Sequence, residues 1–260
     1  MNHRVTIKTK KTLAILIFAF TLLSAGKAAT YYAINSGDWE NEKIWKSASL
    51  NQSYPQEKDT VYILNKITVT ISSSISCQDL IIGEGISGNI LFTNSKSIRL
   101  TVRGNLIINQ GAKLEYNSNS SKIHNLTIEG NLINQGIVKL RVDADDLVTI
   151  TCNGLSDTYM DGEGEWQVAG LIINKEQKNN KVEIRSTNFA NALTTAANFL
   201  SSPSISLLKG TFIQNNIGSI DCIVDPINGK VVNYTIPSDV CIEIKKGTLL
   251  FSTLANVILR

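Results

Sequence analysis

The chain has 260 residues, with 25 Lys and Arg against 22 Asp and Glu, so its formal charge is +3 at neutral pH. Apolar residues make up 43% of the chain and charged residues only 18%, which excludes intrinsic disorder, and 17 Gly with 4 Pro exclude a collagen-like chain. The length suffices to bury one core or two small ones, and the charge alone leaves a nucleic-acid partner open.

The first 29 residues have the three parts of a secretory signal peptide. Four basic residues occur within residues 4–11, an apolar run of 11 residues covers 13–23, and small residues follow at 24–29. The run is shorter than the roughly 20 residues of a spanning helix, which makes an uncleaved membrane anchor the less favoured alternative. We predict a signal peptide at 1–29, export to the extracellular space or the outer cell surface, and no transmembrane segment after cleavage.

Cleavage would also change the charge. The leader carries five basic residues and no acidic one, which leaves 20 of the 25 basic residues against 22 acidic residues, a net charge of −2. The remaining Lys and Arg are scattered along the chain, so there is no electrostatic reason for binding a phosphate backbone. We therefore expect no nucleic-acid partner.

Residues 30–60 are expected to form an N-terminal cap. They contain Trp39 and Trp45, and a polar stretch at 46–58 separates these from the first long strand. Solenoids need atypical terminal units that cover the first coil, and we expect this segment to fold over the coils that follow.

Residues 61–260 read as one short strand after another, bounded by Gly, Asn and Ser. Residues 100–107 (LTVRGNLI) return 26 positions later at 126–133 (LTIEGNLI). A period in the twenties is typical of a solenoid whose coils stack on one another. We predict an all-β protein, a single-stranded right-handed parallel β-helix (β-solenoid) with an N-terminal cap. The alternative is a β-sandwich, which is less favoured because Asn-Gly and Asp-Gly hairpin signals are scarce.

One segment within the coils is ambiguous. Residues 187–200 place Phe189, Leu193, Ala196 and Leu200 at helical spacing, yet Thr194 and Thr195 suit a strand and corner equally well.

The N-terminal half carries a pattern of the form SGxW...W...P...DxVxI...VTV. Its residues are Ser36, Gly37, Trp39, Trp45, Pro55, Asp59, Val61 and Ile63, followed by the strand at 67–70. This pattern resembles the G8-like N-terminal segment of secreted bacterial parallel β-helix proteins, and residues 153–157, Gly162, Gly164 and residues 170–175 are similar to their later coils.

The resemblance implies a large extracellular or cell-surface protein, often exported by the type IX route, with stacked coils and usually no catalytic site in this part. Such proteins typically continue into further domains and a C-terminal sorting domain, which this chain lacks. An apolar strand pattern also continues to Arg260. We expect the chain to be the N-terminal part of a larger protein, truncated at its C-terminus.

Signals of hydrolytic catalysis are weak. His124 is the one histidine outside the leader, and we expect it at a solvent-facing corner rather than in a catalytic triad. No Gly-x-Ser-x-Gly elbow, Walker motif or dinucleotide motif occurs. We predict no enzyme, no catalytic residue and no cofactor, with a polysaccharide lyase or glycoside hydrolase as the alternative.

Two acidic groups are the weak candidates for carboxylate chemistry. Asp143, Asp145 and Asp146 form the first, and Asp157, Asp161, Glu163 and Glu165 form the second, of which Asp157, Asp161 and Glu163 are the weak candidates for a metal site. The second group alternates with glycine and offers oxygen ligands for Ca²⁺, but it lacks the EF-hand order. Solvated turns are the preferred interpretation of both.

The four cysteines, Cys77, Cys152, Cys222 and Cys241, have no C-x-x-C spacing, which disfavours a zinc site. Cys222 and Cys241 are 19 residues apart, close to one coil, and are the candidate disulfide. Cys77 and Cys152 are about three coils apart, too distant to bridge, and are expected to be free and buried.

These observations favour a non-enzymatic, exported structural or adhesion β-solenoid module at the cell surface or outside the cell. The alternative is an extracellular glycan-binding or polysaccharide-degrading β-helix protein. Extracellular glycans or other surface proteins are the expected partners.

Overall fold

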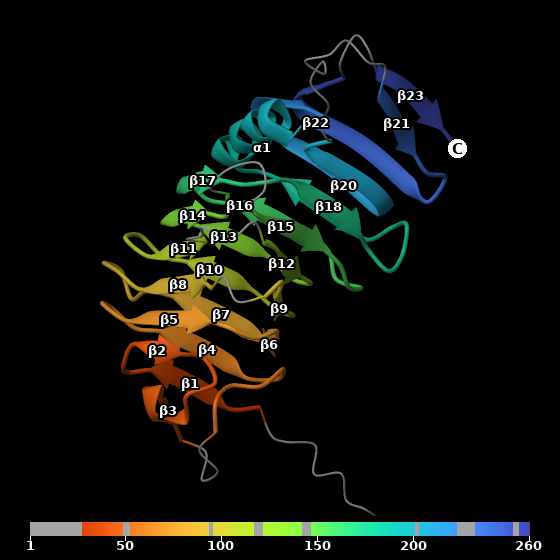
Figure 1. The fold of residues 1–260 in the computed structure, drawn as a ribbon. Helices are drawn as coiled ribbons and strands as arrows, with labels where there is room; N and C mark the ends of the chain where they lie inside the picture. Colours follow the sequence, from red (N-terminus) through yellow and green to blue (C-terminus); the bar gives the residue numbers. More distant parts are fainter. Residues whose placement is uncertain are drawn as a thin grey trace, which may run out of the picture.

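The computed structural model describes residues 28–48, 53–93, 96–116, 122–141, 147–200, 203–222, 232–251 and 255–260. Most of the predicted signal peptide and the acidic group Asp143, Asp145 and Asp146 lie outside the described residues. The described chain is almost entirely β, and its strands stack into a parallel solenoid of about seven turns (Figure 1). The predicted β-solenoid is therefore confirmed, and the β-sandwich alternative is wrong.

Each regular coil contributes one strand to each of three faces, here called faces A, B and C. Face A contains β1 (Thr30–Ala33), β4 (Thr60–Ile63), β7 (Asp79–Ile82), β10 (Leu106–Ile108), β13 (Leu132–Asn134), β16 (Thr158–Asp161) and β19 (Lys181–Ile184). Face B contains β2 (Gly37–Asp38), β5 (Thr68–Ile71), β8 (Asn89–Phe92), β11 (Lys113–Tyr116), β14 (Ile137–Lys139) and β17 (Glu165–Gln167). Face C contains β6 (Ile75–Cys77), β9 (Arg99–Val102), β12 (Ile123–Ile128), β15 (Leu147–Cys152) and β18 (Leu171–Asn174).

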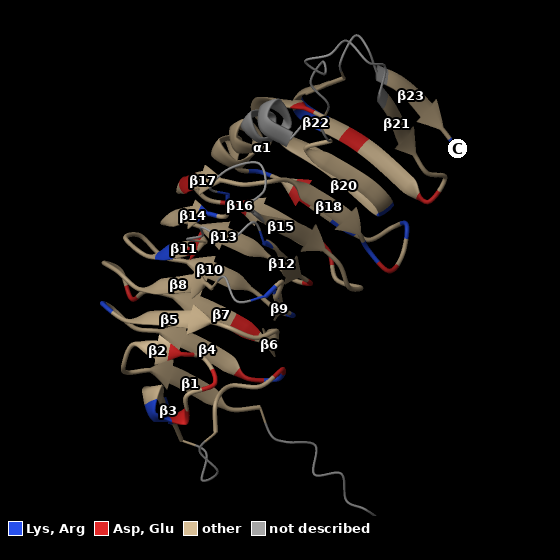
Figure 2. Cartoon of the chain, viewed as in Figure 1, with Lys and Arg blue, Asp and Glu red and all other residues tan. Residues whose placement is uncertain are grey.

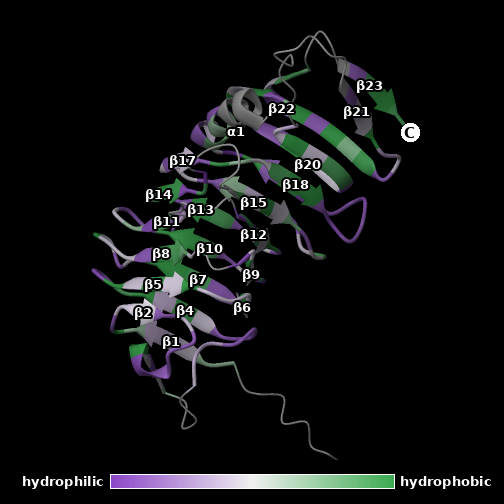
Figure 3. Ribbon diagram, in the orientation of Figure 1, coloured by the Kyte–Doolittle hydropathy of each residue, from purple (hydrophilic) through white to green (hydrophobic). Residues whose placement is uncertain are grey.

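Residues at equivalent positions of the sequence repeat are paired with each other in the sheets. Leu80, Leu106 and Leu132 are partners in successive strands of face A, and all three are fully buried. Side chains alternate along each strand, so one residue of each pair points into the solenoid and the next points outward. Figure 3 shows the hydrophobic residues following the strands while the turns are mostly hydrophilic. Burial of each such aliphatic side chain stabilises the fold by about 1.5–3 kcal/mol.

The N-terminal end differs from the regular coils. β1 pairs in parallel with β4 but antiparallel with β3 (Trp45–Ser47), which follows the short 3₁₀ helix η1 (Glu42–Ile44). Trp39 and Trp45 are buried with ring centroids 5.0 Å apart, and the Trp45 indole N–H donates to the Trp39 carbonyl oxygen at 2.7 Å. Two large rings thus fill the core at this end of the stack.

The ambiguous segment is helical. α1 (Thr187–Leu200) follows β19 and packs mainly against β17 and β20 (Ile205–Asp221). The Ser186 hydroxyl accepts from the Phe189 N–H at 3.2 Å, as a helix N-cap does. Phe189 and Leu193, one turn apart, are both fully buried. Helical spacing of the apolar residues therefore outweighs the strand preference of the threonines.

The last coils are longer and less regular. β20 pairs first with β18 on face C and then with β19 on face A, and it turns between them at Gly210, whose φ is +119°. β22 (Val240–Leu250) pairs in parallel with β20. β21 (Val232–Ile236) and β23 (Ala255–Leu259) form a separate two-stranded parallel sheet beside it (Figure 1).

Candidate functional site

A surface groove of about 780 Å³ lies at the corner between faces A and B. It crosses four consecutive coils, because its lining comes from the turns that follow β7, β10, β13 and β16. Its lining residues are Glu84, Gly85, Asn109, Gln110, Gln135 and Glu163. We call this depression the corner groove.

Tight turns hold the corner groove in shape. The Asn109 amide donates to the Gly83 carbonyl oxygen of the preceding coil at 2.7 Å, and the Asn109 carbonyl oxygen accepts from the Ala112 N–H at 3.0 Å. Gly83 and Gly111 adopt φ values of +83° and +78°, which side chains rarely tolerate. The turn after β10 is thus fixed by hydrogen bonds within itself and to the preceding coil, and the corners of four successive coils line the groove.

The lining is polar rather than strongly charged. Gln110 and Gln135 are exposed and offer amide donors and acceptors, and the carboxylates Glu84 and Glu163 add further acceptors. Glu84 and Glu163 belong to coils three steps apart, about 14 Å along the axis at 4.8 Å per step. This arrangement suits an extended, neutral and hydroxyl-rich ligand better than a compact charged one.

An apolar column runs along face A beside the corner groove. Tyr32, Tyr62, Ile81, Ile107 and Ile133 are partners in register on successive outward positions. The rings of Tyr32 and Tyr62 stack with centroids 5.1 Å apart and planes at 17°, and Tyr32 is 38% exposed. Groove residues follow the isoleucines by two to four positions, so an extended ligand can meet both surfaces.

The three candidate metal ligands do not converge. Asp157 precedes β16 and accepts from the Lys181 backbone N–H at 2.8 Å, whereas Asp161 ends the same strand and accepts from the Gly162 N–H at 2.8 Å. Four residues of extended strand separate their α-carbons by about 13 Å. Glu163 lies at the following corner, in the groove. Within the described ranges, no group of three or more His, Cys, Asp or Glu is placed to hold a metal ion.

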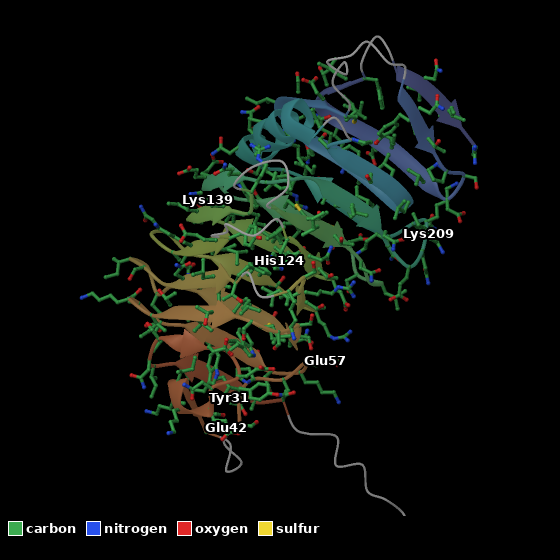
Figure 4. All side chains as sticks on the ribbon, in the orientation of Figure 1. Tyr31, Glu42, Glu57, His124, Lys139 and Lys209 are labelled. Atoms are coloured by element: carbon green, nitrogen blue, oxygen red, sulfur yellow. The ribbon has the colours of Figure 1, made fainter. Side chains whose placement is uncertain are left out.

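The expectation for His124 is wrong, because its side chain is buried rather than solvent-facing. Its exposure is 1%, and Figure 4 places it within the body of the stack. Nδ1 accepts from the Ile98 backbone N–H at 3.1 Å, and the ring centroid lies 4.7 Å from Tyr116 and 5.7 Å from Phe92. His124 occupies an inward position of β12, where Nδ1 accepts a backbone hydrogen bond and the ring packs against two aromatic side chains.

All four cysteines are free in the structure. Cys241 lies near the start of β22, opposite Thr211, whereas the Cys222 N–H donates to the Leu250 carbonyl oxygen at the far end of that strand. Cys241 and Leu250 are nine residues apart along β22, so Cys222 and Cys241 are not directly opposite each other on adjacent strands. The structure does not bring the candidate disulfide partners together, because the last coils are longer than the 19-residue spacing assumed.

Sequence reasoning missed Lys175, a buried cation at the corner after β18. Its side chain is 1% exposed, and its ammonium donates to the Asn153 carbonyl oxygen and, at 3.2 Å, to the Thr158 hydroxyl. Burial lowers the pKa of Lys175. A lysine after a strand normally indicates a solvated turn, so no sequence signal distinguishes it.

A second depression, of about 520 Å³, lies on face C. Arg99, Asn125 and Thr149, which are outward partners in β9, β12 and β15, contribute to its lining. The Asn125 amide donates to the Thr151 hydroxyl at 2.8 Å, so one of its donors is already engaged within the protein. The corner groove has more exposed amide groups and is the better candidate site.

The comparisons with known proteins place no constraint on this site: no protein family model, no curated protein and no solved structure matches the chain. Among the described residues, no helix has the length and apolar character needed to cross a membrane.

Proposed function

We propose that this chain is a non-enzymatic structural or adhesion module, exported to the cell surface or the extracellular space, which binds an extended glycan along the corner groove. The observation that carries this proposal is the groove itself, which presents polar side chains from four successive coils beside an apolar column. Sugars have apolar CH faces and hydroxyl edges, and a polysaccharide repeats both along its length.

The sequence supports the extracellular setting. The leader at 1–29 has the features of a secretory signal, and G8-like proteins are exported β-helices. Figure 2 shows acidic and basic residues interspersed over the described ribbon, without an extended region of one sign. This distribution favours a neutral glycan over a nucleic acid, because phosphate-backbone binding requires clustered positive charge. Another surface protein remains the second partner class.

The degrading-enzyme alternative depends on a carboxylate pair. Glycosidases use two carboxylates about 5–10 Å apart, whereas Glu84 and Glu163 are separated by about 14 Å along the axis. In the second acidic group, Asp161 and Glu163, and likewise Glu163 and Glu165, are two residues apart in one coil. If new reducing ends or unsaturated products form from a bound glycan, and Asp161→Asn abolishes them, the chain is an enzyme.

The binding proposal is tested with a glycan array followed by calorimetric titration of the strongest ligand. The double variant Gln110→Ala with Gln135→Ala removes two exposed amides from adjacent coils and is expected to weaken binding by about tenfold or more. Gln177→Ala is the matched control, because Gln177 is an exposed residue at the turn between β18 and β19, outside the groove lining. Equal affinities of the wild type and the double variant would refute binding in the groove.

A further inference from the structure

Asp59 is a buried carboxylate at the N-terminal end of the solenoid. It directly precedes β4, and its side chain is 6% exposed. Its Oδ1 accepts from the Ala29 backbone N–H at 2.8 Å, and its Oδ2 accepts from the Gln56 backbone N–H at 2.7 Å. Among the described residues, no lysine or arginine forms an ion pair with it. Because buried carboxylates are normally balanced by a cation, this site has the hydrogen bonds of an ionised carboxylate and lacks the opposite charge.

Backbone hydrogen bonds hold Ala29 and Asp59 together. The Ala29 carbonyl oxygen accepts from the Thr60 N–H at 2.9 Å, which continues the parallel pairing of β1 with β4. The Asp59 N–H donates to the Gln56 carbonyl oxygen at 2.9 Å, and the Asp59 carbonyl oxygen accepts from the Gln78 N–H at 2.8 Å. These bonds fix the Ala29 nitrogen beside the carboxylate without involving any residue before Ala29.

The predicted leader ends at this contact. Gly26 and Ala28 are small residues at the positions three and one before a cut between Ala28 and Ala29, which is the pattern that signal peptidases recognise. This cut falls one residue before the end of the leader as predicted at 1–29. Ala28 is exposed, whereas Ala29 is partly buried against the core. The bond to be cut therefore lies where the chain enters the fold.

Given the export proposed above, on which this step rests, we propose that removal of the leader turns the Ala29–Asp59 contact into an ion pair that locks the N-terminal cap. A signal peptidase hydrolyses the Ala28–Ala29 amide: the hydroxyl of water bonds to the Ala28 carbonyl carbon, and its remaining hydrogen goes to the Ala29 nitrogen. The new amine binds a proton, because the pKa of an ordinary α-amine lies above neutral pH. The ammonium then lies against Asp59 Oδ1 and supplies the opposite charge. A hydrogen bond between ionised partners is roughly twice as strong as a neutral one.

The first experiment determines the N-terminus of the full chain, expressed with its own leader in a bacterial host, by intact mass and N-terminal sequencing of the exported protein. We expect the exported chain to begin at Ala29. An exported chain that begins at another residue overturns the ion pair and leaves the proposed extracellular setting intact. A chain that stays in the cytoplasm with its leader attached overturns the proposed export, and the ion pair with it.

The second experiment moves the ammonium away from Asp59. Insertion of Gly-Ser between Ala28 and Ala29 keeps the cut after Ala28 and the net charge of the exported chain, but leaves an amide at the Ala29 nitrogen. Hydrogen exchange in β1 and β4 is expected to be about tenfold faster than in the wild type, because a hydrogen bond between charged groups is replaced by a weaker one. Reductive methylation at pH 7 should label the α-amine of the wild type about tenfold more slowly than that of the insertion variant, because the carboxylate favours the unreactive ammonium.

Asp59→Asn separates the ion pair from crowding by the two inserted residues. Without the carboxylate no ion pair can form, so in this background the insertion should change exchange in β1 by less than about twofold. An insertion that speeds exchange equally in both backgrounds would overturn the proposal. The methylation rates are measured with Asp59 in place, so they decide the matter even where Asp59→Asn does not fold: equal rates for the wild type and the insertion variant would also overturn it.

Discussion

His124 shows that a residue type usually expected at the surface can be buried in the core. Its Nδ1 accepts a backbone N–H, and its ring packs against Phe92 and Tyr116, so burial leaves the imidazole with partners on several sides. Those partners are in the previous coil or on another face. A sequence reading can place His124 in a strand, but it cannot supply these contacts, which depend on the stacking register.

The reactivity of the four cysteines tests the burial of single residues in the structure. Burial raises the pKa of Cys152 and of Cys222 to about 12, and burial also raises the pKa of Cys77, whereas Cys241 is exposed. Because the thiolate is the reactive form, Cys241 alone should react rapidly with a thiol reagent in the folded protein at pH 8.

We therefore expect one fast thiol per chain under native conditions and four after unfolding in denaturant without reductant. Cys241→Ser should remove the fast reaction and leave three thiols in denaturant. Only two thiols in the unfolded wild type would instead demonstrate a disulfide and contradict the separation of Cys222 and Cys241.

At the scale of elements, the 26-residue offset predicted the central strands correctly because it is a direct record of stacking. Leu106 and Leu132 are 26 residues apart in the sequence and are partners in the sheet. The same reasoning failed for Cys222 and Cys241, since β20 and β22 belong to longer coils with shifted registers. The sequence also did not predict the corner groove. Its lining residues are of types common in turns, and the groove forms because four successive coils place these turns at the same corner.

β10 offers a matched pair of substitutions. Leu106 is fully buried and points inward, whereas its neighbour Ile107 points outward and is partly exposed. Leu106→Ala leaves a cavity between two coils and is expected to lower the free energy of unfolding by about 2–5 kcal/mol. Ile107→Ala removes a similar side chain from the surface and should cost less than about 1 kcal/mol.

Urea denaturation of both variants, followed by circular dichroism, measures the two changes. Equal losses of stability would mean that face A does not alternate between inward and outward residues as the structure has it. Ile107→Ala also serves as a probe of the apolar column, since it should weaken glycan binding without unfolding the coil.

At the scale of the whole molecule, stability is distributed along one axis. Each coil contacts chiefly the coil before it and the coil after it, so the energetics approximate those of a one-dimensional array. Such an array can lose structure at one end while the other end stays folded. This behaviour distinguishes a solenoid from a compact domain in which all elements share one core.

Hydrogen exchange measured by mass spectrometry can show whether the ends behave independently. Val61 is fully buried in β4 and pairs with Tyr31 in β1 and Leu80 in β7, whereas Val182 occupies a buried position in β19, four coils away from β7. Val61→Ala is expected to speed exchange by about tenfold in β1, β4 and β7 and to change β16 and β19 by less than about twofold. Val182→Ala, the matched variant, should speed exchange in β16, β19 and β20 while β1 and β4 keep their wild-type rates. Equal acceleration along the entire chain by either variant would show that the coils unfold as a single cooperative unit.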